Sequence, residues 1–290
     1  MKDFCILTDS SCDLPAKAAG ELEISVVPLS VLIDGKSYSN YLDGREIGFE
    51  EYYALLRSGK SAVTSSVNVS QFLTIMEEML LRGKNILYLG FSSALSGTYD
   101  AASLAAKELA LKYPERKIRT IDTLSASLGQ GLLVYLAARQ AEAGKTMDEV
   151  ADFVVKTRSH LCQWFTVDDL DFLHRGGRVS KATAVVGGAL GIRPILHVDN
   201  GGRLTKAGVA RGRKASIQAL VEKMKASVSD PQDQTVFISH GDCIGDAESL
   251  ARMIRDEVGV KTIFINYIGP VNGAHSGPGT LCLFFVGAER

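Results

Sequence analysis

The sequence predicts an α/β protein with two domains. In the first half, short apolar runs alternate with amphipathic stretches, which favours a mostly parallel sheet flanked by helices. In the second half, the turn sequence Asp199-Asn200-Gly201-Gly202 separates two short apolar runs, which predicts a hairpin and a mixed or antiparallel sheet. A chain of 290 residues is long enough for two ordinary domains. We expect an N-terminal domain at residues 1–160 and a C-terminal α/β domain at residues 161–290.

The elements expected in the first domain alternate between strand and helix. Short apolar runs predict the strands, and apolar residues at helical spacing, such as Phe72 and Met76, predict the helices. Strands are expected at residues 4–8, 25–33 with a break at Pro28, 85–90 and 118–122, and helices at 49–57, 70–82, 96–112, 127–143 and 146–158. Thr146 is a candidate N-cap of the last helix, because Glu149 follows it at capping-box spacing.

The second domain is expected to mix strands, helices and two long loops. Strands are predicted at residues 161–167, 193–198, 203–209, 235–240, 261–267 and 280–286, and helices at 181–190, 214–227 and 245–258. Residues 168–180 are predicted to form a polar loop. Residues 268–280, with four glycines and two prolines, are predicted to form a tightly shaped loop.

Composition limits the classes of function. The chain is 46% hydrophobic and 22% charged with a net charge of -1, so nothing in the overall charge favours nucleic acid. Residues 175–214 are an exception, with nine Lys or Arg and one acidic residue, Asp199. This basic segment is either a docking face for an acidic partner or phosphate, or a solvated surface.

Cysteine use and hydropathy point to the cytoplasm. The five cysteines are scattered and form no CxxC pair, which is typical of thiols in a reducing compartment. Asp9 lies too early for a secretory signal, and no apolar run reaches the roughly 18 residues of a membrane span. We therefore expect a cytoplasmic protein without stable membrane insertion.

Two hydroxyl-rich turns are the most informative local feature. One is Thr64-Ser65-Ser66, and the other ends in Ser96, Gly97 and Thr98 at the start of a predicted helix. We expect both at the carboxyl ends of strands, where ligands bind in open α/β sheets. Gly97 allows close backbone approach, and the helix N-terminus attracts an anion. The two turns predict an anion cradle, with simple helix capping as the alternative.

Other polar residues have a structural and a functional interpretation. His275, in the glycine-rich loop, is either a structural histidine or part of the site. Asp9 and Asp13 follow the first strand and are interpreted as helix caps rather than metal ligands. Arg175 and Arg178, in an Arg-Gly-Gly-Arg sequence, are candidates for clamping a phosphate or carboxylate.

Several catalytic signatures are absent from the sequence. It has no G-x-S-x-G elbow, no Walker loop, no HExxH motif and no G-x-G-x-x-G after a strand. Gly129 and Gly131 lie in a helical pattern and are explained by close helix packing. We expect no cofactor and no metal. A cradle without an activated nucleophile favours a protein that holds a molecule over an enzyme.

Two other functions stay open from the residues alone. A serine esterase or thioesterase would use Ser96 or Ser65 with His275, and would need an orienting carboxylate. A binder of small phosphates would use Arg175, Arg178 and Arg213.

The motifs also resemble a known family when they are taken together and in order. They are Thr8-Asp9-Ser10-Ser11-Cys12-Asp13-Leu14, Thr64-Ser65, Ser92-Ser93-Ala94-Leu95-Ser96-Gly97-Thr98-Tyr99, Asp122 with Ser127-Leu128-Gly129-Gln130-Gly131, Arg175-Gly176-Gly177-Arg178, Ile192-Arg193-Pro194-Ile195-Leu196 and His275-Ser276-Gly277-Pro278-Gly279. This set, which spans essentially the whole chain, resembles the DegV family of bacterial fatty-acid-binding proteins.

The resemblance implies a long-chain fatty acid buried between two α/β domains. It implies that Thr64 and Ser96 hydrogen-bond the carboxylate, with His275 close by and Arg175 as a weaker candidate. The neighbours Ser65, Gly97 and Thr98 complete the expected binding site. In place of prolines usual for the family, this chain has Val67 and Val69, so we expect a less rigid loop after Thr64.

The resemblance also implies a partner. Some family members are the lipid-carrying subunit of a fatty acid kinase, in which a separate ATP-dependent subunit phosphorylates the bound acid. By this analogy, Arg203, Arg211 and Arg213 in the basic segment are candidates for docking that subunit.

Overall fold

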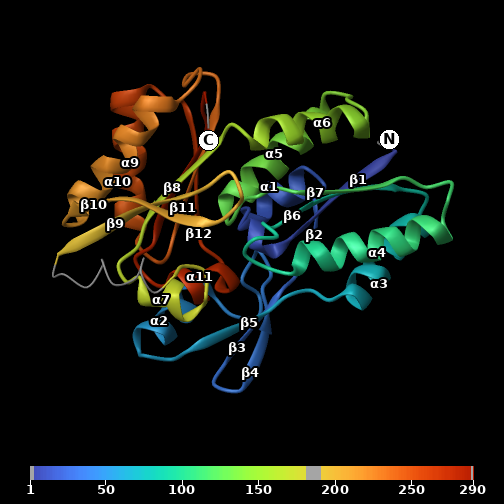
Figure 1. The fold of residues 1–290 in the computed structure, drawn as a ribbon, viewed down its shortest axis with the longest axis horizontal. Coiled ribbons are helices and arrows are strands. Elements are labelled where there is room, and N and C mark those ends of the chain that lie inside the picture. Colours follow the sequence, from blue (N-terminus) through green and yellow to red (C-terminus); the bar gives the residue numbers. More distant parts are fainter. Residues whose placement is uncertain (1–2, 181–190, 289) are drawn as a thin grey trace.

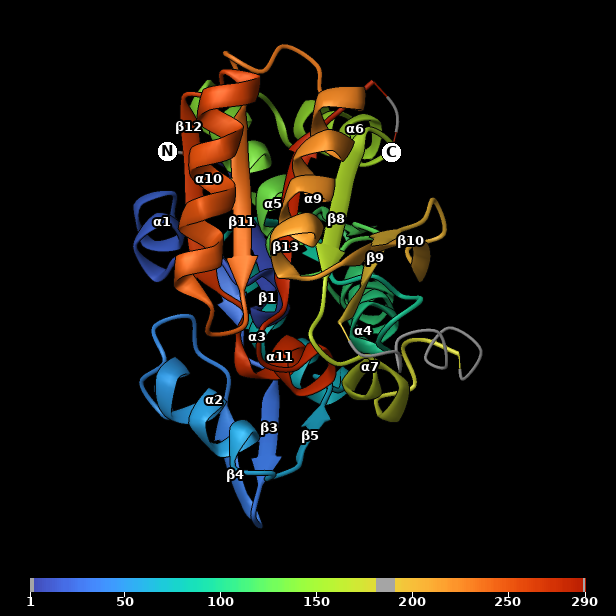
Figure 2. The same cartoon turned by 90° about the vertical axis from the view of Figure 1, so that its left-hand side faces the viewer.

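The computed structural model describes residues 3–180, 191–288 and 290, and contains three β-sheets (Figure 1). The helix predicted at residues 181–190 lies outside the described residues. The two larger sheets lie at opposite ends of the molecule, and the smallest extends from its lower side as drawn (Figures 1 and 2). The predicted α/β class, with a parallel N-terminal sheet and a mixed C-terminal sheet, is confirmed.

Sheet A consists of four parallel strands in the order β2-β1-β6-β7. Its strands are β1 (Phe4–Asp9), β2 (Ser25–Val27), β6 (Asn85–Gly90) and β7 (Ile118–Asp122), and the short helices η1 (Ser10–Cys12) and α1 (Ala16–Glu21) follow β1. The predicted break near Pro28 is confirmed, because β2 ends at Val27. The carboxyl ends of β1 and β6 point toward the centre of the molecule (Figure 1).

Helices cover both faces of sheet A. They are α3 (Val69–Leu81), α4 (Thr98–Lys112), α5 (Leu128–Glu142) and α6 (Met147–Arg158). Successive residues of β6 point to opposite faces: Ile86 and Tyr88 pack in the cluster that includes residues of α3 and α4, whereas Leu87 and Leu89 pack in the cluster with residues of α5 and α6. The predicted capping box at Thr146 is present at the start of α6.

Sheet C has six strands in the order β10-β9-β8-β13-β11-β12, of which only β11 and β12 pair in parallel. The strands are β8 (Leu161–Thr166), β9 (Ile192–Val198), β10 (Leu204–Arg211), β11 (Thr235–His240), β12 (Thr262–Tyr267) and β13 (Leu281–Val286). The predicted hairpin is confirmed as β9–β10. Helices α9 (Arg213–Ser227) and α10 (Ile244–Val258) cover the outer face of sheet C.

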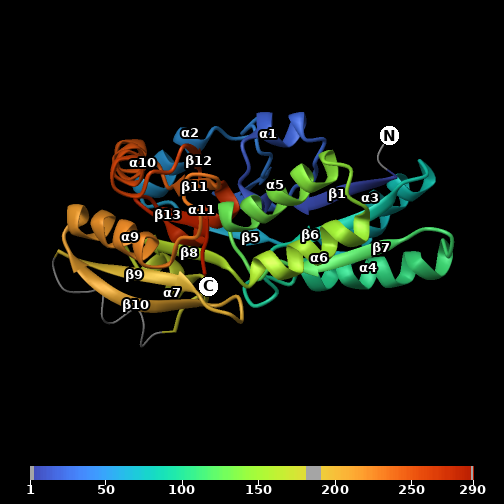
Figure 3. The same ribbon diagram turned by 90° about the horizontal axis from the view of Figure 1, so that it is seen from above.

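Helix α5 lies between sheets A and C, at the centre of the molecule in Figure 3. A Cβ built on Gly129 would lie 2.3 Å from Gln163 Oε1 and 2.9 Å from Phe284 Cδ1, both in sheet C. On Gly131 it would lie 2.5 Å from Cys12 O. The predicted close packing at these glycines is therefore confirmed. Helix α5 contacts both sheets, so its packing does not mark where one domain ends and the next begins. The domain boundary near residue 160 therefore stays a prediction.

Sheet B was not predicted from the sequence. Its antiparallel strands β3 (Ser30–Ile33), β4 (Lys36–Ser39) and β5 (Ala62–Ser65) pair in the order β4-β3-β5, and α2 (Phe49–Arg57) packs beside them. Thr64 and Ser65 thus lie in a strand, so the expected turn at these two residues is wrong, whereas their expected place at the carboxyl end of a strand is confirmed. The pairing of Val31 with Thr64 joins segments far apart in the chain, which local patterns do not report.

The two loops predicted in the second half each contain a short helix, α7 (Asp171–Arg175) and α11 (Pro270–Ser276). The glycine and proline content of residues 268–280 led to the wrong prediction of a loop. Pro270 instead occupies the start of α11, where its missing N–H and fixed φ are tolerated.

Candidate functional site

A cavity of about 230 Å³ lies where the three sheets approach one another. Its apolar wall comes from the end of β6 and from sheet C, and includes Phe91, Phe165, Val198, Leu204 and Phe284. Its polar wall includes Thr64, Ser66, Ser96, Arg178, His275 and Ser276. The cavity therefore combines an apolar wall with hydroxyl groups, an imidazole and a guanidinium group.

Thr64 and His275 are in direct contact in the polar wall. Thr64 Oγ1 lies 2.9 Å from His275 Nε2, although the residues are 211 positions apart. His275 Nδ1 is buried and has no partner among the described residues. An unpaired buried N–H is less favourable than an unpaired ring lone pair, so we place the ring hydrogen on Nε2. His275 then donates to Thr64, and the hydrogen of Thr64 is free to donate to a ligand.

His275 is neutral at physiological pH in this environment. Burial and, to a smaller extent, the positive charge of Arg178 lower the pKa of its imidazole to about 4. A neutral imidazole does not form an ion pair with a carboxylate. Its role in the site is therefore to orient the Thr64 hydroxyl.

Ser96 contributes a hydroxyl from the turn before α4. Ser96 N donates to Ser92 O at 3.2 Å, which closes the turn, and the N-cap of α4 is Gly97, so the alternative that Ser96 is the N-cap residue does not hold. Ser96 Oγ lies 2.9 Å from Thr98 Oγ1 and accepts from Thr98 N at 3.3 Å. A Cβ on Gly97 would meet no atom within 4 Å, so the helix N-terminus is open to a ligand here.

Arg178 supplies positive charge to the cavity wall. Its Nε and Nη2 donate to Leu95 O at 3.2 and 3.1 Å, and Nη1 donates to Gly176 O. Within residues 3–180, 191–288 and 290, no carboxylate pairs with it. Burial lowers the pKa of its guanidinium group. From the sequence, Arg178 is a candidate for clamping a phosphate or carboxylate, and its place in this wall depends on contacts with the turn before α4.

Three residues expected at the site do not line this cavity. Ser65 follows Thr64 in β5 and therefore points to the opposite face. Thr98 is fully buried behind Ser96. Arg175 is exposed, stacks on Phe172 with its guanidinium carbon 4.8 Å from the ring centre, and lines a neighbouring pocket instead.

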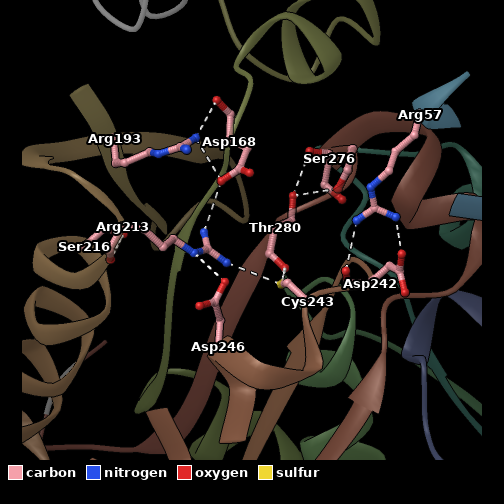
Figure 4. A network of polar contacts seen from close by, with 11 residues as sticks. Arg57, Asp168, Arg193, Arg213, Ser216, Asp242, Cys243, Asp246, Ser276 and Thr280 are labelled. Atoms are coloured by element: carbon pink, nitrogen blue, oxygen red, sulfur yellow. Dashed lines mark hydrogen bonds and ion pairs between the residues drawn. The ribbon is translucent and has the colours of Figure 1, made fainter. Parts of the chain in front are cut away.

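The basic residues expected to dock a partner differ in their availability. Arg203 and Arg211 are exposed. Arg213 is bound instead: its Nε lies 2.8 Å from Asp246 Oδ2 and its Nη1 lies 3.3 Å from Asp168 Oδ1, as Figure 4 shows. Arg213 therefore does not join Arg175 and Arg178 in one phosphate clamp.

Asp9 and Asp13 are buried and serve as hydrogen-bond acceptors. Asp9 caps η1 by accepting from Ser11 N at 3.1 Å, as expected. Asp13 does not cap α1; it accepts from Gly269 N at 3.0 Å and from Ser127 Oγ at 2.6 Å. Burial raises the pKa of Asp13 to about 7.

No group of metal ligands and no helix suited to crossing a bilayer occurs in the described part of the chain.

Comparison with known proteins identifies the family. The model of the DegV family, described as an uncharacterised protein family, matches residues 3–288. The chain belongs to the DegV family. A DegV domain-containing protein from Clostridium perfringens is 45% identical over 290 residues, covering 100% of this chain and 99% of the relative. The expected family resemblance is therefore confirmed over the whole chain.

Solved DegV structures share the fold described above. A DegV lipid-binding protein from Thermotoga maritima matches with a TM-score of 0.88 and 30% identity, covering 100% of both chains. A fatty-acid-binding DegV family protein from Thermus thermophilus matches with a TM-score of 0.88 and 30% identity, covering 98% of this chain and 99% of that one. The three-sheet arrangement is thus shared with DegV proteins that bind lipid.

Proposed function

We propose that this DegV protein binds a long-chain fatty acid in the cavity between its sheets. The carboxylate accepts hydrogen bonds from Thr64 and Ser96, and His275 orients Thr64. The contact between Thr64 and His275, in a cavity that also has an extensive apolar wall, carries the proposal. The fatty-acid-binding DegV protein from Thermus thermophilus supports it.

The energetics favour a long apolar tail. Burying about fifteen methylenes contributes roughly 12 kcal/mol, at about 0.8 kcal/mol each. Burying a carboxylate costs several kcal/mol unless it is hydrogen-bonded or paired, and each hydrogen bond to a charged group returns about 1.5–3 kcal/mol. The tail supplies most of the affinity, whereas Thr64 and Ser96 fix the position of the carboxylate.

The geometry does not support the serine esterase alternative. His275 Nε2 bonds to Thr64 rather than to Ser96 or Ser65, and Nδ1 has no carboxylate partner in the described residues. A serine hydrolase requires both contacts, one to activate the nucleophile and one to orient the base.

We further propose that the bound acid is presented to an ATP-dependent kinase subunit. Ser66 and Gly97 line the cavity and are also exposed, so its polar end opens to solvent. Phe165 and Phe284, at the apolar wall, are buried. A carboxylate held by neutral hydroxyls at an open end is accessible to a phosphoryl donor. The exposed Arg203 and Arg211 are the proposed docking residues.

Native mass spectrometry of protein purified from a bacterial host tests lipid binding. We expect a species carrying the added mass of a long-chain acid, and a smaller fraction of loaded protein in the Thr64→Ala/Ser96→Ala double variant. Wild-type protein that carries no lipid and takes up none when supplied with hexadecanoic acid would contradict the proposal.

The kinase role has a separate test. Loaded protein, ATP and the ATP-dependent subunit of a fatty acid kinase are incubated with hydroxylamine, which converts acyl phosphate into a hydroxamate. We expect hydroxamate with wild-type protein and a loss with Arg211→Ala that leaves lipid binding unchanged. Absence of hydroxamate with a fully loaded wild-type protein would contradict the kinase role but not lipid binding.

A further inference from the structure

A second group of polar side chains lines the same cavity, apart from the Thr64–His275 pair. Ser11, Ser127 and Asn272 belong to its wall. They come from η1, from the residue before α5, and from α11. The proposed carboxylate contacts use none of them, so an apolar tail alone leaves these groups without a function in binding.

Ser11 is the unsatisfied member of this group. It is 1% exposed, and its Oγ has no hydrogen-bond partner among the residues that the structure describes. Its neighbours are bonded: Asn272 Nδ2 donates to Ser11 O at 2.8 Å and to Asp13 Oδ2 at 2.7 Å, and Ser127 Oγ donates to Asp13 Oδ2 at 2.6 Å. Because a buried hydroxyl without a partner is unfavourable, Ser11 Oγ is the group with capacity left for a ligand.

The surroundings of Ser11 select a neutral oxygen. Asp9 accepts from Ser11 N at 3.1 Å, and Asp13 lies in the same hydrogen-bond network. Both carboxyl groups are fully buried or nearly so. A second carboxylate of a ligand would be repelled here, whereas a hydroxyl or keto oxygen adds no charge and bonds to Ser11 Oγ.

The position of Asn272 in α11 indicates where this polar group lies relative to the proposed carboxylate contacts. Asn272 precedes His275 by three residues, a rise of about 4.5 Å along the helix axis. A chain whose carboxylate is bound by Thr64 would bring its first few carbons to this position. An oxygen near the distal end of the chain would lie too far from Ser11.

We propose that Ser11 forms a subsite for a hydroxyl or keto oxygen on the acyl chain, within the first few carbons after the carboxylate. The inference rests on the proposed function, since it needs a fatty acid in this cavity. The preferred ligand is then an oxygenated fatty acid rather than a plain saturated one.

Equilibrium binding of a matched set of acids tests the subsite. Delipidated protein is titrated with hexadecanoic, 3-hydroxyhexadecanoic and 12-hydroxyhexadecanoic acids by displacement of a fluorescent fatty acid. In Ser11→Ala, we expect the affinity for the 3-hydroxy acid, relative to hexadecanoic acid, to fall about 3- to 10-fold, the effect of one hydrogen bond. The ratio for the 12-hydroxy acid stays unchanged.

Thermal unfolding without ligand separates this role from a structural one. Because Ser11 Oγ has no partner, Ser11→Ala is expected to keep the wild-type Tm. Ser10→Ala is the matched control, because Ser10 Oγ accepts from Leu29 N at 2.9 Å and from Asn40 Nδ2 at 3.2 Å. We expect this variant to have a lower Tm but an unchanged ratio of affinities for the 3-hydroxy acid and hexadecanoic acid.

Three results would overturn the inference. An unchanged ratio in Ser11→Ala, with hexadecanoic acid bound tightly, would overturn it alone. A fall in Tm for Ser11→Ala as large as for Ser10→Ala would assign the hydroxyl a structural role. Failure of hexadecanoic acid to bind the wild-type protein would overturn the proposed function, and this inference with it.

Discussion

Gly176 lies directly against the imidazole of His275. A Cβ built on Gly176 would stand 2.3 Å from His275 Nδ1, closer than a side chain can approach, and at a tight 3.2 Å from Phe172 O. The missing side chain at residue 176 therefore allows the ring to occupy its position, from which Nε2 reaches Thr64. Helices α7 and α11 together therefore fix the contact between His275 and Thr64.

Gly176→Ala is expected to weaken fatty acid binding about 10-fold or more. The added methyl displaces the imidazole, and Thr64 loses the donor that orients its hydroxyl toward the carboxylate. Displacement of a fluorescent fatty acid measures the change in Kd. Gly20→Ala is the control, because a Cβ there meets nothing within 4 Å. Equal Kd values for the two variants would show that the ring position does not matter for binding.

Thr64→Val and Ser65→Ala should differ sharply in their effect. Valine keeps the shape of Thr64 but removes the hydroxyl, so we expect about a 10-fold or greater increase in Kd for hexadecanoic acid. Ser65 is exposed on the other face of β5, and its replacement should leave Kd unchanged. Calorimetric titration of both delipidated variants checks this. A comparable loss in Ser65→Ala would argue that the bound acid contacts the outer face of sheet B.

His275 makes the stability of the ligand-free protein depend on pH. Its pKa is lowered from 6.5 to about 4 by burial, so the unfolded state takes up a proton first as the pH falls. The stabilisation is present above pH 6.5 and is lost as the pH falls toward 4. Compared with His275→Gln, the wild-type protein should lose about 2 kcal/mol more unfolding free energy between pH 6.5 and 5.

Urea denaturation at the two pH values measures this difference. His240, whose pKa burial also lowers to about 4, titrates in both proteins and therefore cancels. Asp13, with a pKa raised to about 7, contributes with the opposite sign in both. Parallel stability curves for wild type and His275→Gln would mean that the imidazole is not held neutral by the fold.

Gly129→Ala is expected to destabilise the packing of α5 against sheet C. The methyl would lie 2.3 Å from Gln163 Oε1 and 2.9 Å from Phe284 Cδ1, which forces a shift that costs about 1–3 kcal/mol. Gly245→Ala in α10, where a Cβ meets nothing within 4 Å, should have no such cost. The midpoint of urea unfolding distinguishes the two, and similar midpoints would contradict close packing at Gly129.

Local sequence patterns predicted most regular elements well. The strand at residues 85–90, the helix at 49–57 and the capping box at Thr146 were found because each depends on residues close in the chain. Sheet B was missed because its pairing joins residues 30–33 to residues 62–65. Helix α11 was missed because glycine and proline usually end helices, whereas Pro270 begins this one.

The sequence by itself determined the α/β class, the order of most strands and helices, and the DegV resemblance. It also identified Thr64, Ser96 and His275 as candidate site residues. Only the tertiary structure decided that Thr64 and not Ser65 faces the cavity, that His275 bonds to Thr64, and that Arg213 is occupied by acidic partners. The physical reason is the range of the contacts. Periodicity and capping depend on neighbours in the chain, but strand alternation, burial and hydrogen-bond pairing in the site depend on which distant segments the sheets bring together.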